Sequence, residues 1–192
     1  HALAEVCLRW IGTHMPTVSS AFEFLESESR VLFPNVRSML YVGHRSDTSP
    51  WWRTSFWEAL GRPELGVIDI QPANLDSASG FASRLVHGDI RTFDARGFDL
   101  VFWDEGPEHV ARDEALATCT RLALHSQVLI SCPWGYQPQG SGPDDYEFHH
   151  WGPEIADFES IGMEARCFGT HFDGVGGGHG NLIAWSPMHS GA

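Results

Sequence analysis

The chain has 192 residues, of which 42% are hydrophobic and 19% are charged, so it can build one folded domain and is not composed like a disordered protein. Its 25 acidic residues outnumber its 12 lysines and arginines, the net charge is −13, and no run of basic residues occurs. This balance argues against a nucleic-acid partner and against binding to anionic membranes. The apolar stretches also fall far short of the ~20 residues that span a bilayer. We therefore expect a small-molecule partner.

The cysteines and the first residues bear on the compartment. The four cysteines lie far apart and form no Cys-x-x-Cys pair, and no basic start followed by an apolar run marks a signal peptide. Free thiols without a disulfide framework are typical of a reducing environment. We expect a cytoplasmic protein with these thiols unpaired: Cys7, Cys119, Cys132 and Cys167.

Residues 1–35 have helical character. Apolar side chains recur at helical spacing over residues 3–12, and Thr17, Ser19 and Ser20 offer caps for a second short helix. Pro34 and Asn35 then break the pattern. We predict a helical N-terminal cap over 1–35, followed by a single α/β domain over 36–192.

From residue 38 onward, apolar runs alternate with helical segments. Runs without polar alternation indicate strands buried on both faces, and helices between them supply the crossovers of a parallel sheet. The sequence thus predicts a three-layer, doubly wound α/β fold with a mostly parallel seven-stranded sheet and an antiparallel last strand. The expected strands are 38–43, 65–70, 84–90, 98–104, 127–133, 164–172 and 181–187, and the expected helices are 50–61, 71–83, 106–123 and 153–161.

The order of these motifs resembles the class I methyltransferases that use S-adenosylmethionine, over residues 36–187. The matching segments are MLYVGHRSDTSPW (39–51), LGVIDIQPANL (65–75), LVHGDIRTF (85–93), FDLVFWDEGPEHV (98–110) and VLISCPWG (128–135). The resemblance implies a Rossmann-like fold, S-adenosylmethionine as cofactor and S-adenosylhomocysteine as product. It also implies methyl transfer to an oxygen or nitrogen of a small-molecule acceptor.

Residues at the predicted strand ends then take cofactor roles. The Asp69 carboxylate could accept hydrogen bonds from both ribose hydroxyls, with Ile70 covering one adenine face. Asp89 could accept from the adenine amino group, and Asp104 could meet the ammonium of the methionine end. Gly43 removes a Cβ where backbone approaches the ligand. We place His44, Arg45 and Ile90 in the same site.

Plainer roles stay open for these residues. Asp69 could cap the helix that follows it, and Asp89 could satisfy amides in a turn. Arg45 and Asp47 could pair with each other on the surface.

The first loop departs from the family. Over residues 43–49 its only glycine is Gly43, whereas the family usually has two or three glycines there. A catalytically inactive methyltransferase-like domain, kept for binding or assembly, therefore stays open as the alternative. A nicotinamide-dependent oxidoreductase is disfavoured, because Gly-x-Gly-x-x-Gly is absent after the first strand.

Methyl transfer needs no protein nucleophile, since the cofactor already activates the methyl group. A base helps when the acceptor is a hydroxyl or an amine, and His109, His149 and His150 are the candidates. The Glu108–His109 pair could instead simply open the helix at 106–123.

A long aromatic loop after the fifth strand holds Trp134, Tyr136 and Tyr146, which we expect to line the acceptor pocket. A lid or a homodimer contact is the alternative role for this loop. Several histidines lie between residues 149 and 179, but no spacing matches a structural zinc pattern, so no metal site is predicted.

Overall fold

The computed structural model describes residues 18–44, 55–174 and 180–187. Its main feature is a seven-stranded sheet with the strand order β3-β2-β1-β4-β5-β9-β7. The strands are β1 (Ser38–Val42), β2 (Glu64–Asp69), β3 (Arg84–His87), β4 (Leu100–Asp104), β5 (Gln127–Pro133), β7 (Glu164–Phe168) and β9 (Asn181–Trp185). β3, β2, β1, β4 and β5 pair in parallel, and β9 inserts antiparallel between β5 and β7. This topology confirms the predicted fold class.

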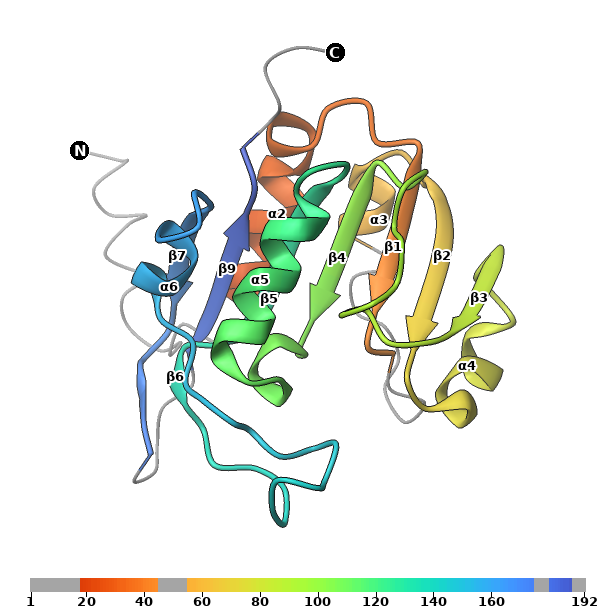
Figure 1. Ribbon diagram of the computed structural model, residues 1–192. Helices are drawn as coiled ribbons and strands as arrows, with labels where there is room; N and C mark the ends of the chain where they lie inside the picture. The colour runs from red at the N-terminus through yellow and green to blue at the C-terminus, as the bar shows by residue number, and fades with distance from the viewer. Residues whose placement is uncertain (1–17, 45–54, 175–179, 188–192) are drawn as a thin grey trace, which may run out of the picture.

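Helices cover both faces of the sheet, as Figure 1 shows. One face packs against α5 (Arg112–Leu122) and α6 (Ile155–Glu159), and the other against α2 (Val18–Leu32), α3 (Phe56–Ala59) and α4 (Pro72–Ala78). Successive residues of a strand point to opposite faces, so Leu40 joins the α5 core and Met39 joins the α2 core. The central strand β4 is buried along its whole length.

The helix α2 packs on one face of the sheet. Residues 1–17 of the predicted cap lie outside the described part of the chain, and the predicted second helix is α2, which is longer than expected. Its Leu25 side chain is fully buried against the sheet.

Several predicted elements need correction at their ends. The helix expected over 106–123 divides into a 3-10 turn (Pro107–His109) and α5, because Val110 and Ala111 adopt extended backbone between them. The helix expected over 71–83 ends at Ala78, shortly before Gly80. The strand expected over 84–90 ends at His87, because a turn begins at Asp89. The Asp89 carbonyl accepts a hydrogen bond from the Phe93 amide at 2.9 Å. Of the helix expected over 50–61, residues 50–54 lie outside the described ranges, and α3 ends before Gly61.

The chain after β5 leaves the sheet and passes below its carboxyl edge. There β6 (Gly135–Tyr136) pairs with β8 (Phe172–Asp173) in a small separate sheet. The segment from residue 137 to residue 152 then forms the long loop seen below the strand ends in Figure 1.

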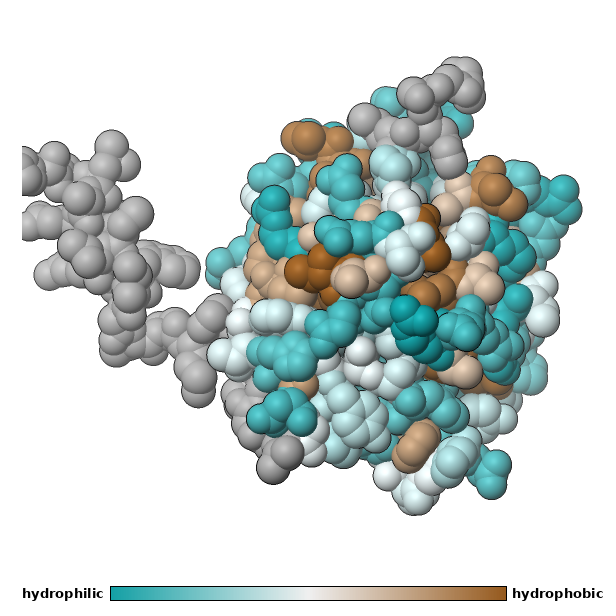
Figure 2. Space-filling view, turned by 60° about the vertical axis from the view of Figure 1, so that its left-hand side comes forward, coloured by the Kyte–Doolittle hydropathy of each residue, from teal (hydrophilic) through white to brown (hydrophobic). Residues whose placement is uncertain are grey.

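The helices, the surface and the cysteines can be compared with what the composition predicts. None of the helices among the described residues combines the length and apolarity needed to cross a bilayer. On the face shown in Figure 2, apolar residues lie in separate patches with hydrophilic residues between them. The three described cysteines are unpaired, with Cys119 and Cys132 buried. The homodimer stays a prediction.

Candidate active site at the carboxyl edge of the sheet

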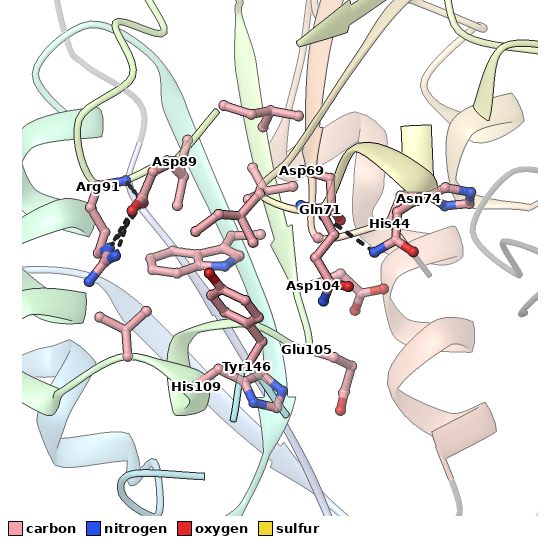
Figure 3. A pocket seen from close by; sticks show the side chains of 18 of the residues that line it. His44, Asp69, Gln71, Asn74, Asp89, Arg91, Asp104, Glu105, His109 and Tyr146 are labelled. Atoms are coloured by element: carbon pink, nitrogen blue, oxygen red, sulfur yellow. Dashed lines mark hydrogen bonds and ion pairs between the residues drawn. The ribbon is translucent and has the colours of Figure 1, made fainter. Parts of the chain in front are cut away.

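A cavity of about 400 Å³ opens where the parallel strands end. This volume lies in the usual range for small-molecule sites. Val42, Ile68 and Trp103 are in register on neighbouring strands, so the residues that follow them meet at one rim. Seven of the eight predicted cofactor residues line the cavity: Gly43, His44, Asp69, Ile70, Asp89, Ile90 and Asp104. Figure 3 labels four of them, His44, Asp69, Asp89 and Asp104. The eighth, Arg45, lies outside the described residues.

Gly43 turns the chain sharply after β1. Its φ is +82°, in the left-handed region that disfavours side chains, and a Cβ there would lie 3.4 Å from the Asp104 carbonyl oxygen. Its amide donates to the Ile68 carbonyl at 3.1 Å. The single glycine of the first loop thus stands where the backbone requires one.

His44 is buried beside this turn. Its Nε2 lies 2.9 Å from the Ser77 hydroxyl, which itself donates to the Asn74 carbonyl at 2.8 Å. The imidazole is therefore the donor to Ser77. Burial lowers the pKa of His44, which favours a neutral ring that ties the β1 loop to α4.

Asp69 ends β2 with its carboxylate at the cavity wall. Its Oδ1 accepts from the Gln71 amide at 2.7 Å and from the Asn74 side chain at 3.2 Å. Burial raises the pKa of this carboxyl, and these hydrogen bonds oppose the rise. The structure therefore places Asp69 both at the helix start and at the cavity, the two positions that its alternative roles require.

Asp89 is strongly engaged by Arg91. Its two oxygens accept from Arg91 Nε at 3.0 and 2.8 Å, and Oδ2 also accepts from Nη2 at 2.6 Å. Hydrogen bonding to Arg91 lowers the pKa of Asp89. An adenine amino group would have to share these oxygens with the guanidinium, which qualifies the adenine role expected for Asp89.

Asp104 carries an acceptor atom without a partner. Its Oδ2 accepts from the Tyr41 hydroxyl at 3.0 Å, and no donor among the described residues meets hydrogen-bond geometry at the buried Oδ1, although the Ser131 side chain lies near enough to lower the pKa of this carboxyl. Burial raises the pKa of Asp104 to about 6. An unsatisfied carboxylate oxygen at a cavity wall is suited to a cationic group of a ligand.

Two predicted histidines meet on the opposite side of the cavity. His109 lies in the 3-10 turn after β4, and its Nδ1 is 3.3 Å from the Phe148 carbonyl. His149 comes from the long loop, and the two rings stand edge to face with centroids 4.6 Å apart. Burial, and then the charge of His109, lower the pKa of His149 to about 4. Tyr146 lines the cavity beside them.

The other predicted residues of the long loop, Trp134, Tyr136 and His150, are not among the residues that line the cavity. His150 is exposed and packs on Phe148. The Trp134 indole donates to Glu154 at 3.1 Å, and Tyr136 is exposed on β6. The pairing of β6 with β8 directs this segment away, and the loop returns to the cavity only from Gln139.

Sequence reasoning missed several cavity residues. Tyr41 reads as a core strand residue, and Asn74 as a helix residue with no signal of its own. Glu105, in contrast, lies in the 98–110 segment that the sequence places at the active edge; it precedes the 3-10 turn at φ +47°, and its carboxylate accepts from Asn181 at 3.2 Å. Gln139 and Glu147 reach the cavity only because the long loop folds under the sheet.

Comparison with known proteins decides what fold this is. No protein-family model matches the sequence, and no curated protein gives a significant match. Among solved structures, DesVI of Streptomyces venezuelae is 14% identical with a TM-score of 0.58, covering 98% of this chain and 99% of that one. The magnesium protoporphyrin IX methyltransferase ChlM of Synechocystis, with bound S-adenosylmethionine, is 15% identical with a TM-score of 0.53, over 88% of this chain and 77% of that one. The mitomycin 7-O-methyltransferase MmcR is 12% identical with a TM-score of 0.53, over 86% of this chain, which spans only 53% of MmcR.

The chain has the class I methyltransferase fold. In this methyltransferase fold, the cavity lies at the carboxyl edge of the parallel strands, where open α/β sheets bind ligands. The residues that line it fit an adenosyl group with an amino-acid end. They offer a carboxylate at Asp69, apolar surface at Ile70 and Ile90, and a second carboxylate at Asp104.

Proposed function

We propose that the chain transfers a methyl group from S-adenosylmethionine to an oxygen or nitrogen of a small-molecule acceptor. The observation that carries the proposal is the convergence of Gly43, Asp69 and Asp104 on one cavity, with Asp104 Oδ1 unsatisfied among the described residues. A glycine turn, a carboxylate for hydroxyl groups and a carboxylate for an ammonium are what such a cofactor needs. The bound cofactor would supply the activated methyl group.

The residues of the chain would position the two reactants. Asp69 would accept from the ribose hydroxyls, and Ile70 and Ile90 would flank the adenine. Asp104 would hold the ammonium, and its ionisation matters because only the charged form forms an ion pair. Alignment of donor and acceptor can account for most of the rate in such a displacement.

The acceptor would enter beside His109 and His149. His149 has a pKa of about 4, which makes its imidazole a weak base near pH 7, so the proton-accepting role falls to His109 if a side chain fills it. MmcR and ChlM act on small molecules by their names. Together with the net charge of −13, they favour an acceptor of this class that is neutral or cationic.

The test is binding of S-adenosylhomocysteine by isothermal titration calorimetry. We expect wild type to bind one equivalent and Asp69→Ala to bind about 10- to 100-fold more weakly, because the loss of one or two hydrogen bonds to a charged group costs ~1.5–3 kcal/mol. Asp94→Ala is the control, because Asp94 is exposed, forms an ion pair with the neighbouring Arg96 and does not line the cavity. Equal affinities in wild type and Asp69→Ala would refute the assignment of Asp69.

A turnover assay distinguishes an active methyltransferase from a catalytically inactive methyltransferase-like domain. A panel of hydroxyl- and amine-bearing small molecules, assayed for S-adenosylhomocysteine release, is expected to give at least one acceptor. Cofactor binding without release from any acceptor would favour a binding or assembly domain. Absence of cofactor binding would overturn the proposal itself.

A further inference from the structure

Three side chains of metal-ligand type meet at the acceptor side of the cavity. Glu108, His109 and His149 each offer one ligand atom, and these atoms all lie within 4.8 Å of one another. Glu108 and His109 come from the 3-10 turn after β4, and His149 from the loop that follows β5. Figure 3 shows His109 beside Tyr146 at this end of the cavity.

The burial of Glu108 is unexplained by its protein contacts. The residue is 1% exposed, and neither carboxylate oxygen has a hydrogen-bond partner within the described ranges. A buried carboxylate is costly when charged, and it still needs a partner when protonated. The Glu108 carboxyl therefore needs a hydrogen-bond donor or a cation that the described residues do not supply.

His149 presents a second buried atom of this kind. The residue is 2% exposed, and its Nδ1 has no hydrogen-bond partner in the described part of the chain. The ring makes a hydrogen bond with the backbone of Gln137, which must involve the other nitrogen. A histidine that ligates a metal usually holds its second nitrogen in this way. His109 follows the same pattern, with Nδ1 at the Phe148 carbonyl.

The surroundings are anionic. Burial raises the pKa of Glu108 well above its usual range, and the charges of Glu105, Asp104 and Glu147 raise it further. The negative charges near Glu108 thus favour a bound cation at this end of the cavity.

The geometry points to a binding site for one divalent first-row transition-metal ion, held by Glu108, His109 and His149. Two imidazoles and one carboxylate form a facial set that leaves open positions on the far side of the ion. His109 and His149 line the cavity, so these positions would face the acceptor. The ion would resolve the unsatisfied atoms of Glu108 and His149 together.

The ligand class follows from this arrangement, and this step rests on the proposed methyl transfer. Open positions on a divalent ion favour an acceptor that presents a hydroxyl, because a metal-bound oxygen loses its proton more easily. The hydroxyl proton passes to solvent, the oxygen lone pair forms the bond to the methyl carbon, and the carbon–sulfur electrons stay on sulfur. His109 is then a ligand and not the base.

The experiment measures metal binding directly, on tag-free protein stripped with a chelator. Isothermal titration with Zn²⁺, Mn²⁺ and Mg²⁺ and the visible spectrum with Co²⁺ are the readouts. We expect one equivalent of Co²⁺ or Zn²⁺, tighter than Mn²⁺, with Mg²⁺ weakest, since two imidazoles favour the later metals. Absence of saturable one-to-one binding would overturn the inference.

Variants assign the ligands. His149→Ala and Glu108→Gln should weaken Zn²⁺ binding by at least about 100-fold, more than changes outside the ligand set usually do. His150→Ala is the matched control, because it changes the adjacent histidine, which does not line the cavity. Equal weakening in His150→Ala, or none in His149→Ala, would contradict the site.

Folding and the proposed function are checked in the same proteins. Glu108→Gln should leave metal-free protein at least as heat-stable as wild type, since it removes a buried charge, and should lose the Zn²⁺-dependent rise in Tm. S-adenosylhomocysteine affinity is measured in the same variants, because His149 lines the same cavity as Asp69 and Asp104. Metal binding without cofactor binding would refute the methyl-transfer proposal alone, and the reverse would refute the metal site alone.

Discussion

Asp104 is a buried carboxyl whose charged form opposes the stability of the fold. Its carboxyl is buried at the end of β4, and the Tyr41 hydroxyl satisfies only one of its oxygens among the described residues. Burial disfavours the charged form, so the pKa rises to about 6 from the ordinary 3.8. The folded chain without ligand therefore carries an electrostatic cost at neutral pH.

We predict that Asp104→Asn raises the free energy of unfolding at pH 7.5 by about 2–3 kcal/mol, from roughly two pKa units at ~1.4 kcal/mol each. Because the folded-state pKa of Asp104 is raised, wild-type stability from this group is greatest below pH 4 and falls as pH rises through about 6. Urea unfolding of both proteins at pH 4, 5, 6 and 7.5 measures this. A difference that does not shrink toward pH 4 would contradict the assigned cause.

Asp104→Asn should also weaken the binding of S-adenosylhomocysteine at pH 7.5. The amide cannot form an ion pair with the ammonium of the ligand. We expect affinity for wild type to increase between pH 5 and pH 7, as Asp104 ionises, and to stay flat in the variant. Calorimetry across this pH range tests the expectation, and parallel pH profiles would exclude Asp104 as the group that contacts the ammonium.

Two elements on one face of the sheet are joined by Asp157. Its Oδ1 accepts from Arg112 Nε at 2.8 Å and Nη2 at 2.6 Å, which ties α6 to the first residue of α5. Its Oδ2 accepts from the Glu154 amide at 2.9 Å and completes a capping box. One carboxylate thus caps α6 and fixes it beside α5.

Asp157→Ala is therefore expected to lower the free energy of unfolding by about 1–3 kcal/mol, from a lost cap and lost hydrogen bonds to a charged group. Asp113→Ala is the control: its side chain is 95% exposed although it also contacts Arg112, so a change within ~0.5 kcal/mol is expected. Chemical denaturation of the two variants provides the comparison. Equal losses would mean that α5 and α6 are not coupled through Asp157.

At the scale of the whole molecule, the sheet separates two cores. The α2 helix contributes to one of them through Ala21 and Leu25, both fully buried, together with Phe33 just after it. These contacts argue that α2 is part of the cooperative unit and not a separable cap. Its removal would expose the face of the sheet that carries Met39 and Phe102.

We predict that Leu25→Ala lowers the free energy of unfolding by about 2–5 kcal/mol, the usual cost of a cavity in a core. Unfolding should remain a single transition when it is followed both by far-UV circular dichroism and by tryptophan fluorescence. Val31→Ala on the same helix is the control, since Val31 is 68% exposed. An early, separate transition for the N-terminal segment would show that it folds independently.

The sequence by itself determined the fold class and most of the residues that the strand ends contribute to the cavity. Apolar strands without alternation can only be buried on both faces, and the ends of parallel strands must share an edge. Gly43, Asp69, Asp89 and Asp104 could therefore be placed at one rim from their positions after the apolar runs. The competition between Arg91 and a ligand for Asp89 could not be predicted, because it depends on the path of the turn after β3.

Only the tertiary structure decided which residues of the long loop line the cavity. Aromatic composition favoured Trp134 and Tyr136, but the pairing of β6 with β8 turns them away, and the loop brings back Tyr146 and His149. His149 meets Glu108 and His109 across 40 residues of sequence, so no local spacing could reveal the cluster. Short-range patterns fix strands and turns, whereas the contacts of a long loop depend on where the whole sheet lets it pack.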